Sequence, residues 1–284
     1  MHISSINVYD AKNIHDVLNL LDKEPGRWSI LAGGTDIMVQ LDLGTWQAPN
    51  LINIWGISDL SGIRINKNEI EIGALSTFSE IINHPIIKKE FPMLIEAAML
   101  TGSIAIQNRG TIGGNIMNAS PAADTPPALL AYGAEIELTS KNEVRRLFYK
   151  DFHINYKLMR INQDEILTKI ILPRTSNKTI DFYQKVGTRA AHSISKACIA
   201  VRLTMDKKTI TDIKIGLGAV APMPIRVYMT EDLLKGNKLS MDLIDQAILQ
   251  IASEIHPIDD IRSNKAYRLR VAINLLRNFL KGLL

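Results

Sequence analysis

The sequence predicts an α+β protein built from three modules, at about 1–56, 57–172 and 173–284. Stretches with apolar residues three and four positions apart, typical of helices, alternate with short stretches of period two or continuous apolar character, typical of strands. In the last module the strand-like runs come first and helical runs close the chain, an order that favours the α+β class. A polar segment at 173–178 would link the second and third modules.

The first module begins with a predicted helix at 14–21, where apolar residues recur at helical spacing and Asn13 is a candidate N-cap. Pro25 and Gly26 would end this helix. A strand at 28–32 then runs directly into Gly33 and Gly34, and a further strand is expected at 50–54.

In the second module, apolar and polar residues begin to alternate with a period of two. This alternation predicts a hairpin of strands at 62–65 and 69–73 around Asn66-Lys67-Asn68. Helices are expected from Thr77, over 92–100 with Pro92 in the first turn, and over 128–132, followed by a strand at 134–138. In the third module we expect strands at 181–186, 195–205 and 210–220, and helices at 243–254 and 266–282.

Composition excludes several classes of protein. The chain has 284 residues, 46% hydrophobic and 22% charged, as in ordinary soluble globular proteins. No apolar run approaches the roughly 20 residues of a membrane span, and no secretory signal is visible, so a cytoplasmic location is expected. The net charge of +4 is spread over lysine and arginine pairs without interleaved aromatics, which favours a solvated surface over nucleic-acid binding.

The chain contains a single cysteine, Cys198. It therefore cannot form an internal disulfide or hold a cysteine-ligated metal or iron–sulfur cluster by itself. Cys198 lies in an apolar strand, where we expect it to be a buried small residue. The six histidines are scattered and show no spacing typical of metal ligands.

Two glycine-rich segments stand out, ILAGGTDI at 30–37 and TIGGN at 111–115. A strand that ends in Gly33-Gly34 can turn with positive φ and present backbone N–H groups that no β-carbon obstructs. Concave runs of such groups bind anions, phosphate above all. The second segment has the same ingredients, so we expect two such loops to converge on one pyrophosphate. Thr35 would add a hydroxyl donor, and Asp36 would cap the next turn or accept from a sugar hydroxyl.

Each segment taken alone is equally compatible with an ordinary turn. Neither contains Gly-x-Gly-x-x-Gly or Gly-x-x-x-x-Gly-Lys-Ser/Thr. Their absence argues against an ordinary dinucleotide-binding βαβ unit and against an NTPase.

Together with motifs further along, the two segments resemble the FAD-binding subunit of the molybdenum hydroxylases, the relatives of xanthine dehydrogenase and carbon monoxide dehydrogenase. The similarity is ordered and extends over nearly the whole chain. Its motifs are AGGTD at 32–36, IQNRGTIGGNI at 106–116, NASP at 118–121 with Asp124, FYQKVGTR at 182–189, GAVAPMPIR at 218–226, and DIRS at 260–263 with Tyr267-Arg268.

The resemblance implies a fold of the vanillyl-alcohol-oxidase type. In it, FAD-binding subdomains at 1–56 and 57–172 sandwich the cofactor, and a C-terminal α+β domain at 173–284 carries an antiparallel sheet. The glycine segments would wrap the pyrophosphate and ribityl chain, and Asp124 would accept hydrogen bonds from the cofactor. The resemblance gives no catalytic side chain and no metal ligand. The cofactor-binding residues implied are Ile30, Leu31, Ala32, Gly33, Gly34, Thr35, Asp36, Ile37, Thr111, Ile112, Gly113, Gly114, Asn115, Asp124, Leu167 and Lys185. For Lys185, a solvated strand lysine is the alternative.

The implied activity is that of an oxidoreductase subunit in a hetero-oligomer. Electrons would come from a molybdopterin centre on a large partner chain, pass through [2Fe-2S] clusters on a small partner chain to FAD here, and continue to NAD or another acceptor. A stand-alone FAD oxidoreductase of the same fold is the alternative. A scaffold that has lost FAD would show eroded glycine segments, and both are intact.

One loop departs from the family pattern. Where some relatives carry an acidic residue near the flavin, this chain has Ala190-Ala191-His192-Ser193, with no carboxylate. The resemblance therefore leaves the electron acceptor open, and it does not identify the substrate. His192 is the one histidine close to the implied site.

Overall fold

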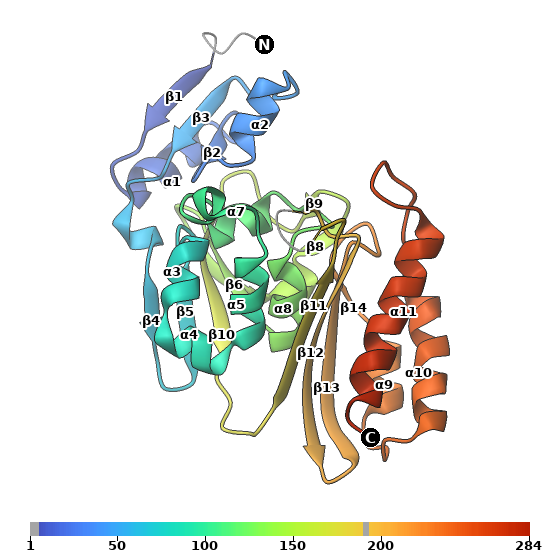
Figure 1. Ribbon diagram of the computed structural model, residues 1–284. Coiled ribbons are helices and arrows are strands. Elements are labelled where there is room, and N and C mark those ends of the chain that lie inside the picture. Colours follow the sequence, from blue (N-terminus) through green and yellow to red (C-terminus); the bar gives the residue numbers. More distant parts are fainter. Residues whose placement is uncertain (1–5, 190–192) are drawn as a thin grey trace.

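The protein is described by a computed structural model over residues 6–189 and 193–284. Three sheets of three, five and four strands and one two-stranded hairpin organise this part of the chain (Figure 1). The predicted loop at Ala190-Ala191-His192, and with it His192, lies outside the described residues.

The first sheet is parallel, in the order β1-β3-β2. Asn13 caps the first helix as predicted, because its side chain accepts a hydrogen bond from the Asp16 N–H at 3.0 Å. That helix buries Val17, Leu18 and Leu21 against Ile52 of the sheet. The elements are β1 (Asn7–Asp10), α1 (Ile14–Lys23), β2 (Ser29–Leu31), α2 (Ile37–Asp42) and β3 (Asn50–Asn53).

The second sheet is antiparallel, in the order β4-β5-β10-β6-β7, and its helices cover one face (Figure 1). Its strands are β4 (Ile63–Ile65), β5 (Glu69–Gly73), β6 (Glu135–Thr139), β7 (Val144–Phe148) and β10 (Ile166–Pro173). Its helices are α3 (Phe78–Asn83), α4 (Pro85–Glu90), α5 (Pro92–Met99), α6 (Ile104–Gln107), α7 (Ile112–Met117) and α8 (Thr125–Tyr132). The 3-10 turns η2 (Ser58–Leu60) and η3 (Tyr149–Asp151) and the hairpin β8 (His153–Asn155) with β9 (Leu158–Met159) complete this part.

Local sequence signals account for much of this second part. The predicted hairpin is confirmed as β4–β5, and Thr77 and Glu80 form a reciprocal capping box at the start of α3. The helix predicted at 128–132 begins earlier, at Thr125, because the prolines after Thr125 are tolerated in a first turn. The sequence did not predict α4, α6, β7, β10 or the β8–β9 hairpin.

The third sheet is antiparallel, in the order β11-β12-β13-β14, and confirms the predicted strands and closing helices. α8 of the second part packs on one face, and α9, α10 and α11 lie on the other (Figure 1). Gly216 permits the first contact, since a β-carbon there would lie 2.2 Å from the Pro127 carbonyl oxygen. The elements are β11 (Ile180–Val186), β12 (Ala197–Asp206), β13 (Thr209–Gly218), β14 (Ile225–Arg226), α9 (Tyr228–Leu234), α10 (Met241–Glu254) and α11 (Lys265–Lys281).

Three clusters of buried hydrophobic residues correspond to the three sheets. The cluster beneath the first sheet also contains residues of the second module. Ile57, Leu60, Leu75 and Ile166, all after residue 56, pack into the core beneath the first sheet. Cys198 is fully buried, as predicted. The division into modules at 1–56, 57–172 and 173–284 stays a prediction, which the sheets and cores support.

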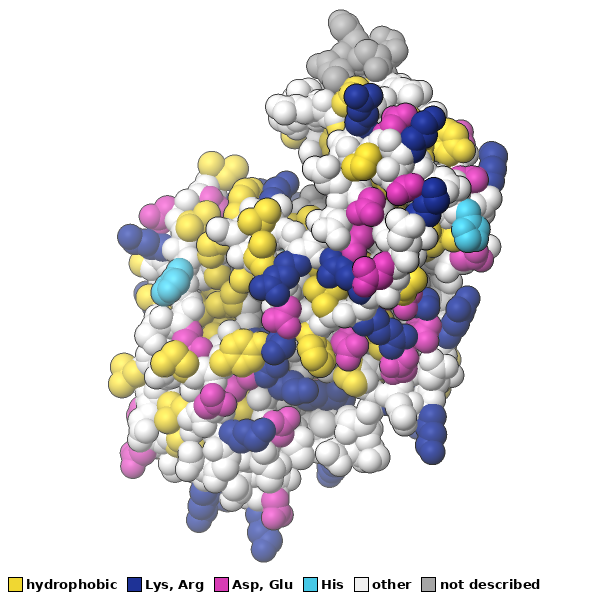
Figure 2. Space-filling view, turned by 180° about the vertical axis from the view of Figure 1, so that it is seen from behind, with side chains coloured by type: hydrophobic (Ala, Val, Ile, Leu, Met, Phe, Trp, Pro, Cys, Tyr) yellow, Lys and Arg dark blue, Asp and Glu magenta, His cyan; other side chains and the backbone are white. Residues whose placement is uncertain are grey.

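On the face seen in Figure 2, basic and acidic side chains are interspersed over the whole surface, and the N-terminal part projects above the rest. Among the described residues, no helix is long and apolar enough to cross a bilayer.

Candidate cofactor site

A cavity of about 560 Å³ lies between the first and second sheets and is walled by both. Most of the predicted binding residues line it: Ile30, Ala32, Gly33, Gly34, Thr35, Asp36, Ile37, Thr111, Gly113, Gly114, Asn115 and Leu167. Leu31, Ile112, Asp124 and Lys185 do not line it. The two glycine segments thus meet at one site, as the sequence predicts.

The first glycine segment leaves β2 and forms one wall of the cavity. Gly34 has a φ of +76°, which confirms the predicted left-handed turn. Gly33 is needed for a different reason, because a β-carbon there would lie 1.7 Å from the Arg109 carbonyl oxygen. In the described part of the chain, no protein acceptor takes a hydrogen bond from the backbone N–H groups between Gly33 and Ile37. These amides are available to an anion.

The second glycine segment is not the predicted positive-φ loop. Gly113 and Gly114 lie in the first turn of α7, outside the positive-φ region. Their N–H groups are already used, by the Ala74 carbonyl at 2.9 Å and by the Thr111 hydroxyl at 3.0 Å. Because Thr111 caps this helix, the segment contributes close packing and a wall without side chains rather than free amides.

Asp36 sits at the end of the first segment and faces the second. It is the residue before α2, but its side chain makes no capping hydrogen bond, so the predicted capping role is wrong. Instead its Oδ1 accepts from the Asn118 side chain at 2.9 Å, which ties the two sides of the cavity together. Burial raises the pKa of Asp36, and the charge of Lys157 opposes that shift.

Asp124 and Lys185 form a buried ion pair behind the cavity wall, with 2.7 Å between Lys185 Nζ and Asp124 Oδ2. Ser195 donates to the other carboxylate oxygen at 2.9 Å, and Lys185 also donates to the Leu100 carbonyl. Burial raises the pKa of Asp124, an effect that Lys185 partly offsets. Since Lys185 is buried and paired, it is not a solvated strand lysine.

This pair connects to the cavity through its neighbours in sequence. Thr101, which follows Leu100, lines the cavity. Thr125, which follows Asp124, donates to the side chain of Asn115 at 2.6 Å, and Asn115 lines the cavity too. The Asp124–Lys185 ion pair therefore supports the cavity wall from behind, through Thr101 and Asn115.

One wall of the cavity carries residues that the sequence did not indicate. They come from the β8–β9 hairpin and the segment that leads into β10, where no glycine motif or strong periodicity marks them. Beside the predicted Leu167, this wall is formed by Lys157, Met159, Ile161, Asn162, Gln163, Glu165 and Ile166. Glu165 is paired with Arg145, which donates to it at 2.8 Å and keeps the pKa of Glu165 below its ordinary value.

The donor set of this cavity suits FAD. Unused backbone amides and a turn with positive φ provide an anion-binding wall. Apolar side chains such as Phe78, Ile106 and Met117 provide surface for aromatic rings. Among the described residues, no group of His, Cys, Asp and Glu side chains is arranged to hold a metal ion.

Comparison with known families agrees with this geometry. The family described as "FAD binding domain in molybdopterin dehydrogenase" matches residues 4–175, and the "CO dehydrogenase flavoprotein C-terminal domain" matches residues 182–283. The chain belongs to the FAD-binding subunits of the molybdenum hydroxylases. It binds FAD, and its relatives are subunits of oxidoreductase complexes.

Individual relatives of this FAD-binding subunit match it nearly end to end. The glyceraldehyde dehydrogenase medium chain of Sulfolobus acidocaldarius is 32% identical over 92% of each chain. The putative xanthine dehydrogenase FAD-binding subunit of Escherichia coli is 28% identical over 92% of this chain and 90% of that one. A solved structure, reconstituted CO dehydrogenase from Oligotropha carboxidovorans, superposes with a TM-score of 0.93 at 28% identity, covering 98% of this chain and 97% of that chain. The predicted fold of the vanillyl-alcohol-oxidase type with a C-terminal α+β domain is confirmed.

Proposed function

We propose that this FAD-binding subunit carries electrons between [2Fe-2S] clusters on a small partner chain and an acceptor, NAD or another, while a large partner chain holds molybdopterin and the substrate. The observation that carries the proposal is the cavity between the first two sheets, where free backbone amides adjoin apolar walls. Bound FAD would supply the redox chemistry. The residues of this chain bind it, orient it and shield it from water.

The need for a partner chain that holds the iron–sulfur clusters follows from the cysteine content of this chain. Cys198 is its single cysteine and is fully buried. Burial raises the pKa of its thiol to about 12, so no thiolate is available as a ligand. An iron–sulfur cluster in the electron path therefore finds no cysteine ligands within these 284 residues, which supports the proposal that a partner chain carries it.

We propose the predicted residues that line the cavity as the FAD contacts, with the Gly33–Gly34 turn at the pyrophosphate. Asp36 is suited to accept a hydrogen bond from a sugar hydroxyl, since its Oδ2 has no partner among the described residues. For Asp124 and Lys185 the resemblance implies direct contact with the cofactor. In the structure they support Thr101 and Asn115 instead, and we propose that they act on the flavin through this wall.

The experiment that tests this function is anaerobic mixing of the isolated, FAD-loaded chain with NADH and with hydroxylase substrates such as purines and aldehydes, while flavin bleaching is followed. We expect noncovalent FAD, released by acid precipitation, and no bleaching by hydroxylase substrates until the partner chains are added. NADH should bleach the flavin of the isolated chain if NAD is the acceptor.

Two results would contradict the proposal. Rapid bleaching by a hydroxylase substrate with this chain alone would establish the stand-alone oxidoreductase. Flavin that stays attached to the acid-precipitated polypeptide would show a covalent link that the chain has no evident residue to form.

A further inference from the structure

The side chains that line the cofactor cavity include few charged groups. Among the described residues that line it, the charged ones are Asp36, Glu165 and Lys157. Glu165 is neutralised by Arg145. The pyrophosphate of FAD would bring further negative charge next to Asp36, and backbone amides supply only partial positive charges.

We propose that Lys157, at the tip of the β8–β9 hairpin, is the cationic partner of the cofactor's pyrophosphate. The inference rests on the FAD site described above and extends it to a residue that neither glycine motif contains. It assigns to the hairpin the role of closing the site electrostatically over the bound phosphate groups.

The turn of the hairpin places Lys157 at the cavity. Lys157, Met159 and Ile161 line the cavity, whereas Leu158 does not line it and is 53% exposed. Lys157 connects the two strands with a φ of +52°, a conformation that side-chain-bearing residues rarely adopt. Glycine or asparagine would adopt this positive φ at a lower energetic cost, yet the sequence has a lysine at this position.

The root of the hairpin is fixed to the elements that build the site. The His153 ring is 3.1 Å from the Ile116 carbonyl oxygen of α7, and the Arg160 N–H donates to the Phe152 carbonyl. α7 is the helix that carries Gly113 and Gly114 (Figure 1). The position of Lys157 is therefore set relative to both glycine segments.

Lys157 is available to a phosphate group. In the described part of the chain its ammonium group makes no hydrogen bond and no ion pair within 4.0 Å. The acidic side chain that feels its charge is Asp36, which ends the run of free amides. An anion bound to those amides would consequently lie between the amide run and the lysine.

The test is titration of the apoprotein with FAD, followed by flavin fluorescence, at low and high ionic strength. At low salt we expect Lys157→Met to raise the Kd roughly three- to tenfold, the size of one partly exposed ion pair. The difference should shrink at high salt, because screening weakens such pairs. Lys157→Arg should bind like the wild-type protein, and Lys67→Met, at an exposed turn away from the cavity, is the matched control.

A second variant separates electrostatics from folding. Lys157→Gly relieves the positive-φ strain, so it should keep or raise thermal stability while it weakens FAD binding as Lys157→Met does. The proposal is overturned if either variant binds FAD with the wild-type Kd, or if the loss is independent of salt or shared by Lys67→Met. A wild-type protein that fails to bind FAD at all would instead overturn the cofactor site itself.

Discussion

Gly33 and Gly34 are adjacent, yet each must be glycine for a different physical reason. Gly34 has a positive φ, and an added β-carbon would make an ordinary van der Waals contact, 3.5 Å from the side chain of Leu31. Gly33 does not have a positive φ, but its α-carbon lies so close to the Arg109 carbonyl that there is no room for a β-carbon. The first glycine permits contact between the two parts of the FAD site, and the second permits the turn.

We expect Gly33→Ala to be the more damaging substitution at this loop. Its β-carbon would overlap a backbone oxygen that cannot rotate away, so the loops must separate. The expected loss is about 1–3 kcal/mol in free energy of unfolding, the usual range for overpacking, together with at least tenfold weaker FAD binding. Urea unfolding and FAD titration measure both quantities.

The control for this prediction is Gly56→Ala, where a β-carbon has nothing within 4 Å. Gly34→Ala should cost about 1–2 kcal/mol from backbone strain. If Gly33→Ala behaves like Gly56→Ala, the close approach of the two loops is not required for the site.

The β8–β9 hairpin shows how an element with weak local signals becomes part of a site. It is a short pair of strands with an irregular register, and several of its apolar side chains are exposed. It keeps its place through ring contacts of His153 with Tyr149 and Phe152 and through the hydrogen bond to α7. A single buried histidine thus anchors one wall of the FAD cavity.

This anchor predicts a pH dependence. Burial lowers the pKa of His153, so the unfolded protein takes up a proton more readily than the folded one. The free energy of unfolding should therefore be unaffected above about pH 6.5 and should fall below it, by at most about 1.4 kcal/mol per pH unit. FAD affinity should fall over the same range, since protonation of His153 favours release of the hairpin.

The measurement is urea unfolding at a series of pH values, compared with His153→Gln. The amide nitrogen of glutamine can stand in for Nε2 as a donor to the Ile116 carbonyl, but it does not titrate. The difference in stability between the two proteins should change between pH 7.5 and 5. A constant difference over this range would mean that His153 does not contribute to the pH dependence.

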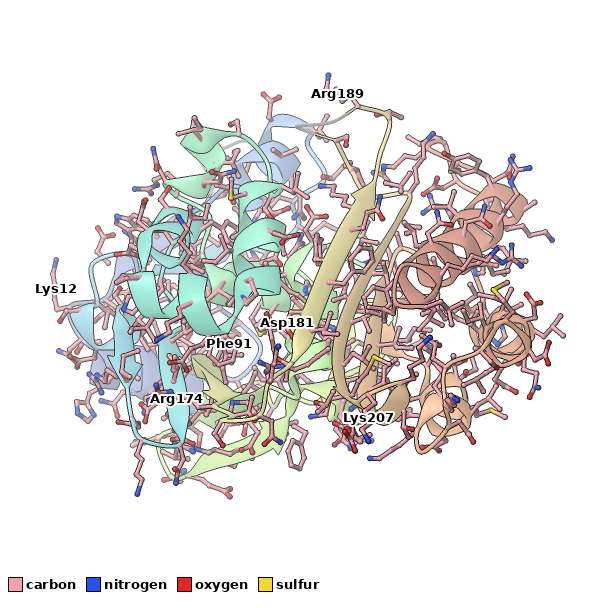
Figure 3. All side chains as sticks on the ribbon, turned by 60° about the horizontal axis from the view of Figure 1, so that its bottom comes forward. Lys12, Phe91, Arg174, Asp181, Arg189 and Lys207 are labelled. Carbon is pink, nitrogen blue, oxygen red and sulfur yellow. The ribbon has the colours of Figure 1, made fainter. Side chains whose placement is uncertain are left out.

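At the scale of the whole molecule, buried polar contacts join the C-terminal sheet to the FAD-binding part. One is the ion pair Lys185–Asp124 behind the cavity. Another is the hydrogen bond that Asp181 of β11 accepts from the hydroxyl of Tyr132 on α8. Asp181 is itself paired with Arg202 of the neighbouring strand β12 and lies near Phe91 (Figure 3). The C-terminal sheet is thus part of the support of the cofactor site rather than an independent appendage.

We expect Lys185→Met to destabilise the apoprotein by about 3–5 kcal/mol, because it leaves the buried Asp124 carboxylate without its partner. The double variant Asp124→Asn with Lys185→Met should recover much of this loss, since no buried charge then remains. Measuring unfolding without FAD separates this effect from cofactor contact. Equal stability of the single and double variants would contradict a coupled pair.

The sequence by itself determined what depends on neighbours along the chain. Asn13 and Thr77 act as predicted caps, because a cap bonds to an N–H group only a few residues away. Period-two runs became strands, and the glycine motifs located the cofactor site and the family. The count of one cysteine excluded an internal cluster without any structure.

Only the tertiary structure decided what depends on distant partners. The first two N–H groups of α7, those of Ile112 and Gly113, bond to the carbonyls of Ser76 and Ala74, a contact that no local pattern reveals. Asp36 pairs with Asn118, Asp124 with Lys185, and Lys157 faces the cavity from a hairpin without a motif. Each of these contacts depends on burial and charge contributed by segments far apart in the chain. They can therefore form and stabilise the structure only after the sheets have packed together.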